Sequence, residues 1–183
     1  MDITVNTRML FKDTLQKKAL KKIDNERVVK YTSLPDVRSA AIIFDINEEN
    51  IIDTVKSLIE ILDRRGVKFS AIAVNFSKFP YPTEFLDHRI YVLNRFDLNF
   101  IGLPKYNKIE EFISLNFNLF IDFSSLYNFT FDYITRSSIA SFKVGRFNYP
   151  NSPYDLSLEN TEDSSSRNYL NSIIHYLTSI RSV

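Results

Sequence analysis

Residues 39–45 read SAAIIFD and residues 68–75 read KFSAIAVN, two short apolar runs that each end in a polar side chain. Runs of this kind are typical of strands buried on both faces of a parallel sheet. Apolar residues recur at helical spacing between them, down to a stop at Gly66. Strand, helix and strand over residues 39–75 have the length of a right-handed βαβ unit. This unit decides the fold class.

The turn after the first strand holds Asp45, Asn47, Glu48 and Glu49. We expect Asn47 to cap the following helix and the two glutamates to stabilise its positive N-terminus. The alternative is that Asp45, Glu48 and Glu49 bind Mg²⁺, because hard cations take carboxylate oxygens. Three carboxylates without a glycine cannot cradle phosphates, so the turn disfavours a Rossmann or P-loop nucleotide site.

The alternation of strands and helices continues to the end of the chain. Apolar runs predict further strands at residues 89–93, 118–123, 140–145 and 154–158, and helices at residues 108–115, 129–138 and 168–180. Ser164, Ser165 and Ser166 are placed to cap the last helix. The pattern predicts an α/β fold, a three-layer α/β/α sandwich with a Rossmann-like, mainly parallel sheet.

A basic amphipathic helix is predicted at residues 7–23, and we divide the chain into an N-terminal segment, residues 1–35, and a single domain, residues 36–183. The segment holds eight basic and four acidic residues. The lysines of this helix either contact the phosphates of a nucleic acid or form the solvated face of the helix. The apolar stripe favours docking on the domain or on a second copy of the chain, with the lysines in solvent. The stripe consists of Leu10, Leu15, Ala19 and Ile23, and the lysines are Lys17, Lys18 and Lys21.

Composition is that of an ordinary globular protein. Of 183 residues, 44% are hydrophobic and 25% are charged, and 23 basic residues nearly balance 22 acidic ones. No global field therefore attracts nucleic acid or an anionic membrane. The absence of cysteine, of an 18-residue apolar run and of a secretory signal indicates a cytoplasmic protein.

Ligands in parallel α/β folds bind beyond the carboxyl ends of the strands. Asp45 ends the first strand, and Asp122, Ser124 and Ser125 end the strand at residues 118–123. We take these four residues as candidate ligand-binding residues. The structural alternative is that they form strand-end turns and helix caps, which Asp and Ser favour.

No catalytic motif stands out. His88 and His175 lack the spacing of a metal pair, and the chain has no G-x-S-x-G sequence among its three glycines. We therefore expect no cofactor and no metal, and we assign no catalytic residue.

Residues 118–125 (NLFIDFSS), residues 138–146 (SIASFKVGR) and residues 154–156 (YDL) carry a resemblance to known proteins. Together with SAAIIFD they resemble an uncharacterised Bacteroidota family of small cytoplasmic α/β proteins, a domain of unknown function, over roughly residues 5–181. The resemblance implies no catalytic residues. Residues 118–146 also resemble the N-terminal half of heptosyltransferase-like glycosyltransferases, whose donor site lies mainly in a second domain.

These observations favour a non-enzymatic cytoplasmic binding or interaction module, with a protein partner or self-association through the N-terminal helix. One alternative is a small-ligand-binding or transferase-like enzyme with its site at the strand ends. The other is a nucleic-acid-associated protein that uses the basic helix.

Overall fold

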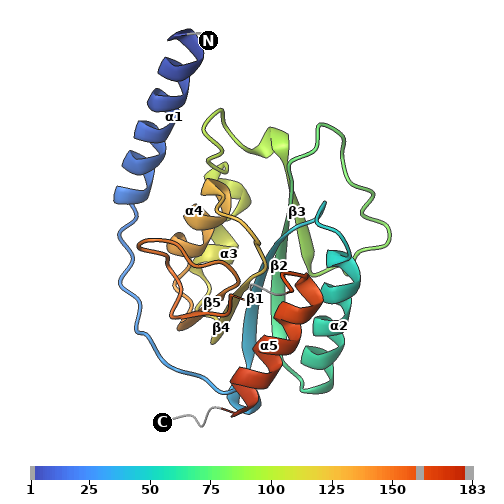
Figure 1. Cartoon of the computed structure of the whole chain (residues 1–183). Helices are drawn as coiled ribbons and strands as arrows, with labels where there is room; N and C mark the ends of the chain where they lie inside the picture. The colour runs from blue at the N-terminus through green and yellow to red at the C-terminus, as the bar shows by residue number, and fades with distance from the viewer. Residues whose placement is uncertain (1–2, 160–162, 180–183) are drawn as a thin grey trace.

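The computed structural model describes residues 3–159 and 163–179, and its central feature is a parallel sheet (Figure 1). Within the described residues the sheet has six strands in the order β3-β2-β1-β4-β5-β6, and every pairing is parallel. The strands are β1 (Ser39–Asp45), β2 (Lys68–Asn75), β3 (Ile90–Asn94), β4 (Leu119–Asp122), β5 (Phe142–Gly145) and β6 (Leu156–Ser157). The predicted Rossmann-like fold is confirmed.

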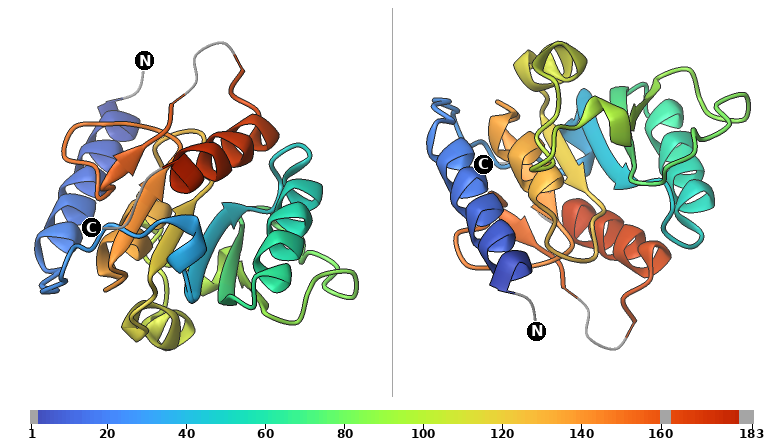
Figure 2. Two further views of the ribbon diagram at one scale, coloured as in Figure 1. Left: turned by 90° about the horizontal axis from the view of Figure 1, so that it is seen from below. Right: turned by 90° about the horizontal axis from the view of Figure 1, so that it is seen from above.

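Helices cover both faces of the sheet, so the three layers are present (Figure 2). The helices are α1 (Ile3–Lys21), α2 (Ile51–Arg64), α3 (Glu110–Ser114), α4 (Phe129–Ser137) and α5 (Ser166–Ser179). Helices α2 and α5 pack together on one face, while α3 and α4 cover the other and α1 packs against α4. None of the described helices combines the length and the apolarity that a bilayer-spanning helix needs.

Strand β1 lies in the middle of the sheet and is apolar throughout because both of its faces are covered. Ala40, Ile42 and Phe44 belong to the core beneath α2 and α5. Ala41 and Ile43 belong to the core beneath α3 and α4. A continuous apolar run, rather than an alternating one, is what such a strand requires.

Helix α2 starts later than the sequence indicated. Its first residue is Ile51, and Asn50 occupies the N-cap position with a φ of 57° and no side-chain cap bond. The prediction that Asn47 caps this helix is wrong, because its side chain bonds Asp45 and Asn75 instead. The predicted stop is confirmed: Gly66 has a φ of 67°, and the N–H of Val67 donates to the carbonyl of Leu62.

The N-terminal helix docks along its C-terminal half. Leu15, Ala19 and, just after the helix, Ile23 are half-buried, while Lys17, Lys18 and Lys21 are exposed. Leu10 is 63% exposed, and the N-terminal end of α1 extends beyond the body of the molecule (Figure 1). The connector after α1 is held at Asn25, whose side chain donates to the carbonyls of Arg136 and Ser138. The division into segment 1–35 and domain 36–183 stays a prediction.

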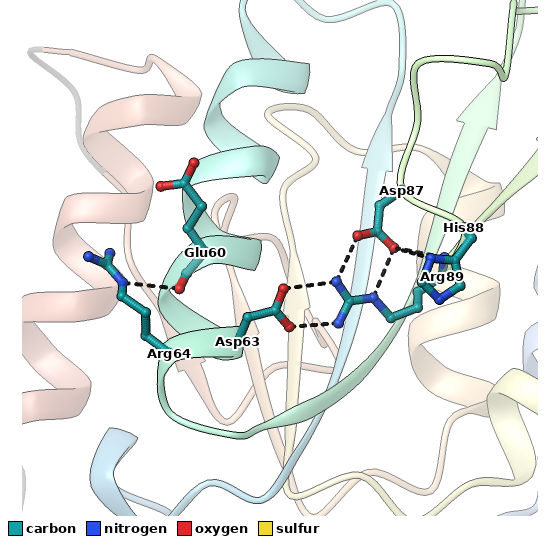
Figure 3. Close-up of polar contacts among 6 residues, drawn as sticks. All are labelled: Glu60, Asp63, Arg64, Asp87, His88 and Arg89. Carbon is teal, nitrogen blue, oxygen red and sulfur yellow. Dashed lines mark hydrogen bonds and ion pairs between the residues drawn. The ribbon is translucent and has the colours of Figure 1, made fainter.

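A cluster of charged residues ties α2 to the start of β3 (Figure 3). Arg89 donates two hydrogen bonds to Asp63, of 2.6 and 2.9 Å, and two to Asp87, of 2.9 and 2.7 Å. Its guanidinium also lies 3.9 Å from the centre of the Phe69 ring. The hydrogen bonds from Arg89 lower the pKa of Asp87 to about 2. This cluster lies at the N-terminal edge of the sheet, where it serves stability.

Candidate functional site

The chain reverses its direction of winding between β1 and β4. From β1 it proceeds to β2 and β3 on one side, and β4 to β6 lie on the other. In open parallel sheets, the crevice beyond the carboxyl ends of the strands at this point is the usual ligand site. The residues that follow β1, β4 and β5 therefore define the candidate site.

Asp122, the last residue of β4, is fully buried and bonded on several sides. It accepts hydrogen bonds from the backbone N–H of Ser124 at 2.8 Å, the hydroxyl of Thr135 at 3.1 Å and the hydroxyl of Tyr154 at 2.8 Å. Burial raises the pKa of Asp122, while these donors oppose that shift. Asp122 joins β4, α4 and the loop before β6, and it does not line the cleft described below.

The ring of Tyr154 lies directly against Gly145 in β5. A Cβ atom added at Gly145 would lie 2.3 Å from this ring, so only glycine allows the contact. Burial, followed by the charge of Asp122, raises the pKa of Tyr154. The tyrosine is a fixed partner of the buried carboxyl.

Asp45 belongs to a separate network of amide groups. Its Oδ1 accepts from the backbone N–H of Asn47 at 2.9 Å and from the Asn47 side chain at 3.1 Å. Asn47 then donates to Asn75, which donates to Asn94 at 3.2 Å. These amides connect the ends of β1, β2 and β3. None of these amides was predicted as a site residue, although Asn75 and Asn94 each end an apolar run.

Arg146 directly follows β5 and is the central charge of the site. Its side chain is 6% exposed, forms an ion pair with Glu48 and donates to the carbonyl of Phe123 at 3.0 Å. Burial raises the pKa of Glu48 although Arg146 opposes the shift. Arg146 therefore joins the three turns that follow β1, β4 and β5. It was not predicted, because one sequence does not show that these strands are neighbours.

A cleft opens beside Arg146, formed by two hollows of about 470 and 810 Å³ with a shared wall. The shared wall consists of Ser125, Arg146, Asp163, Ser164 and Ser165. The smaller hollow extends to Tyr169, and the larger one extends along the N-terminal ends of α2 and α5. Of the four predicted site residues, Ser125 lines the cleft. Ser124 is buried beside Asp122, and Asp45 lies in the amide network.

Tyr169 of α5 lines the smaller hollow. It is 2% exposed, and its ring meets the ring of Phe123 edge-on at 5.2 Å between centres. The Tyr169 hydroxyl is buried and has no hydrogen-bond partner among the described residues. Burial raises the pKa of Tyr169 well above its usual value, and the charges of Asp122 and Arg146 shift it in opposite directions.

The N-terminus of α5 is capped by the chain itself. Asp163 accepts from the backbone N–H of Ser165 at 2.8 Å, and the Ser165 hydroxyl accepts from the N–H of Asn168 at 3.2 Å. The predicted serine cap is thus made by Ser165. Ser166 and Thr54 share a hydrogen bond of 3.0 Å, which joins α5 to α2.

The charges that line the larger hollow are mixed, with an acidic excess. Its carboxylates are Glu48, Glu49, Asp53 and Asp163, and its guanidiniums are Arg146 and Arg167. Such a lining disfavours a polyphosphate. Within the described ranges, no three side chains of the metal-binding types gather into a metal site.

Comparison with known proteins gives a family but no activity. Residues 12–180 match the model of a family of unknown function, DUF6913. No curated protein matches the chain. A crystal structure of an exopolyphosphatase-related protein from Bacteroides fragilis has a similar arrangement, with 13% identity and a TM-score of 0.46. The match covers 92% of this chain and 44% of that one, so the chain spans less than half of it. The resemblance to glycosyltransferases stays a prediction.

Proposed function

The chain belongs to DUF6913, a family of unknown function, and we propose that it is a binding module for a small, uncharged, hydroxyl-rich molecule. The ligand lies in the cleft beside Arg146 and reaches Tyr169. The observation that carries this proposal is Tyr169, which lines the cleft and whose hydroxyl is buried without a hydrogen-bond partner among the described residues. A buried hydroxyl without a partner is costly, and a ligand oxygen removes that cost.

The lining of the cleft supports a polyol or sugar over a phosphate. Carboxylates such as Asp163 accept hydrogen bonds from ligand hydroxyls, and Ser125 and Ser164 both donate and accept. The excess of carboxylates in the lining of the larger hollow repels phosphate groups. The volume of the smaller hollow is that of a small-molecule site.

A binding role is favoured over a catalytic one because the strongest polar groups near the cleft are already bonded. Asp122 accepts three hydrogen bonds, and Arg146 donates to Glu48 and to the carbonyl of Phe123. Because these groups are engaged by the protein itself, they do not exchange protons with a ligand.

A thermal-shift screen of the purified chain tests the chemical class. The library contains matched pairs of neutral and phosphorylated polyols and sugars. We expect a neutral member to raise the melting temperature and its phosphorylated partner to have a smaller effect. Stabilisation by the phosphorylated partners alone would contradict the proposal.

The second candidate function is self-association through α1, which is favoured by three consecutive exposed apolar residues in the middle of the helix. These residues are Met9, Leu10 and Phe11. We propose a second copy of the chain as their partner, because in a twofold pair the same residues of the two copies can cover each other. Sedimentation of the wild type and of Phe11→Asp tests this: a dimer that Phe11→Asp dissociates supports it, and a wild-type monomer at high concentration contradicts it.

A further inference from the structure

Lys143 is a buried lysine in the middle of β5. It is 2% exposed, on the sheet face opposite the core contacts of Phe142 and Val144. Its Nζ donates to the carbonyl of Thr135 at 2.6 Å, in the last turn of α4. No described carboxylate lies within ion-pair distance of this nitrogen.

The charges around Lys143 oppose its protonation. Arg27 from the connector and Arg136 from α4 repel the ammonium form. Asp155 beside β6 attracts it, but both oxygens of Asp155 are bonded by Arg27, at 2.9 and 2.6 Å. Burial, with the help of the two arginines, lowers the pKa of Lys143 to about 7. A large fraction of this amine is therefore neutral and nucleophilic at neutral pH.

Lys143 also lines a cavity of about 410 Å³ between the sheet and the connector. Arg27, Arg136, Tyr154 and Asp155 form its polar walls, and Leu20 and Ile23 of the N-terminal segment form its apolar wall. The hydroxyl of Tyr154 is engaged by Asp122, so it neither takes nor gives a proton at Lys143. An amine this deeply buried is reached most readily by a small uncharged electrophile.

We propose that Lys143 is a carbamylation site for carbon dioxide. The lone pair of the neutral Nζ attacks the carbon of CO₂ and forms a C–N bond. One C=O π pair moves to its oxygen, and Nζ releases one proton to solvent. The product is a carbamate anion, and the step uses no other reactant.

The arginines that destabilise the ammonium stabilise this anion. Arg27 and Arg136 line the cavity, where Arg27 pairs with Asp155 and Arg136 pairs with Asp132. A carbamate oxygen accepts a stronger hydrogen bond from a guanidinium group than from a neutral donor. The carbamate nitrogen keeps one N–H, which preserves the bond to the Thr135 carbonyl. Carbamylation therefore changes the charge of the site from neutral or positive to negative without breaking its structural contact.

The test is a ¹³C NMR measurement of the full chain in ¹³C-labelled bicarbonate at constant dissolved CO₂. We expect a carbamate signal that grows as pH rises through about 7. It is lost in Lys143→Met and kept in Lys68→Met, an exposed control at the start of β2. A signal that Lys143→Met leaves unchanged overturns the proposal.

Chemical trapping in the wild type supports the assignment without any variant. An oxonium alkylating agent converts carbamates to stable esters, and peptide mass spectrometry then locates them. We expect the ester on the peptide that contains Lys143. Esters confined to exposed lysines or to the N-terminal amine, or no ester at all, contradict the proposal even if Lys143→Met fails to fold.

Discussion

At the scale of single residues, the polar groups beside the sheet divide into those that hold the fold and those that face the cleft. Asp122 belongs to the first kind, since three protein donors surround it. Tyr169 belongs to the second, since it lines the smaller hollow and its hydroxyl has no hydrogen-bond partner among the described residues. Residue type alone does not distinguish Asp122 from Tyr169, because both carry a polar group at the edge of an apolar core.

Asp122→Asn should destabilise the protein without changing ligand binding in the cleft. The amide keeps one acceptor oxygen but points a nitrogen toward a buried donor, which costs roughly 1–3 kcal/mol of unfolding free energy. Chemical denaturation measures this loss. The matched control is Asp45→Asn, at a half-exposed strand end with local contacts, where we expect a smaller effect. Equal effects would contradict the structural role of Asp122 in joining β4, α4 and the loop before β6.

Lys143 gives the stability a characteristic dependence on pH. Its pKa is about 7 in the folded protein, against 10.5 for the free side chain, so between these values the unfolded chain binds more protons. The unfolding free energy from this group therefore rises with pH above 7. We expect that rise between about pH 7 and 9 in CO₂-free buffer, before the tyrosines titrate. A slope that persists undiminished in Lys143→Met would contradict the assignment.

At the scale of elements, continuous apolar runs were sufficient to predict β1 and β2. The local sequence was not sufficient to predict where α2 begins. The runs are unambiguous because both faces of these strands are buried. Glu48 suits a helix N-terminus, but an ion pair with Arg146 holds it in the preceding turn. That partner is 98 residues away in the sequence, so local rules cannot find it.

The packing of α1 on the rest of the chain can be tested by mutating one residue of its buried face. Leu15 is half-buried, and Leu15→Asp should cost about 1–2 kcal/mol in lost apolar contact and desolvated charge. For a chain of this size we expect the melting temperature to fall by several degrees. Lys17→Glu and Lys18→Glu alter exposed residues of the same helix and should barely change it. Destabilisation by the lysine reversals with a silent Leu15→Asp would reverse the assignment of the buried face.

At the scale of the whole molecule, the strand order brings the cleft together. Glu48, Ser125 and Arg146 follow β1, β4 and β5, which are neighbours in the sheet but distant in the chain. The general location of the site at the strand ends was predictable from the βαβ pattern, and Ser125 was named on that basis. Arg146 and Tyr169 were not, because their places depend on strand order and on the packing of α5.

The most direct test of the cleft is a calorimetric titration of the neutral ligand that the thermal-shift screen identifies. Tyr169→Phe removes only the hydroxyl, and Tyr176→Phe removes an exposed hydroxyl from the same helix. We predict that Tyr169→Phe weakens binding about tenfold, the value of one hydrogen bond, while its unfolding free energy is unchanged or higher. Tyr176→Phe should bind as the wild type does. Equal affinity in all three proteins would contradict the account.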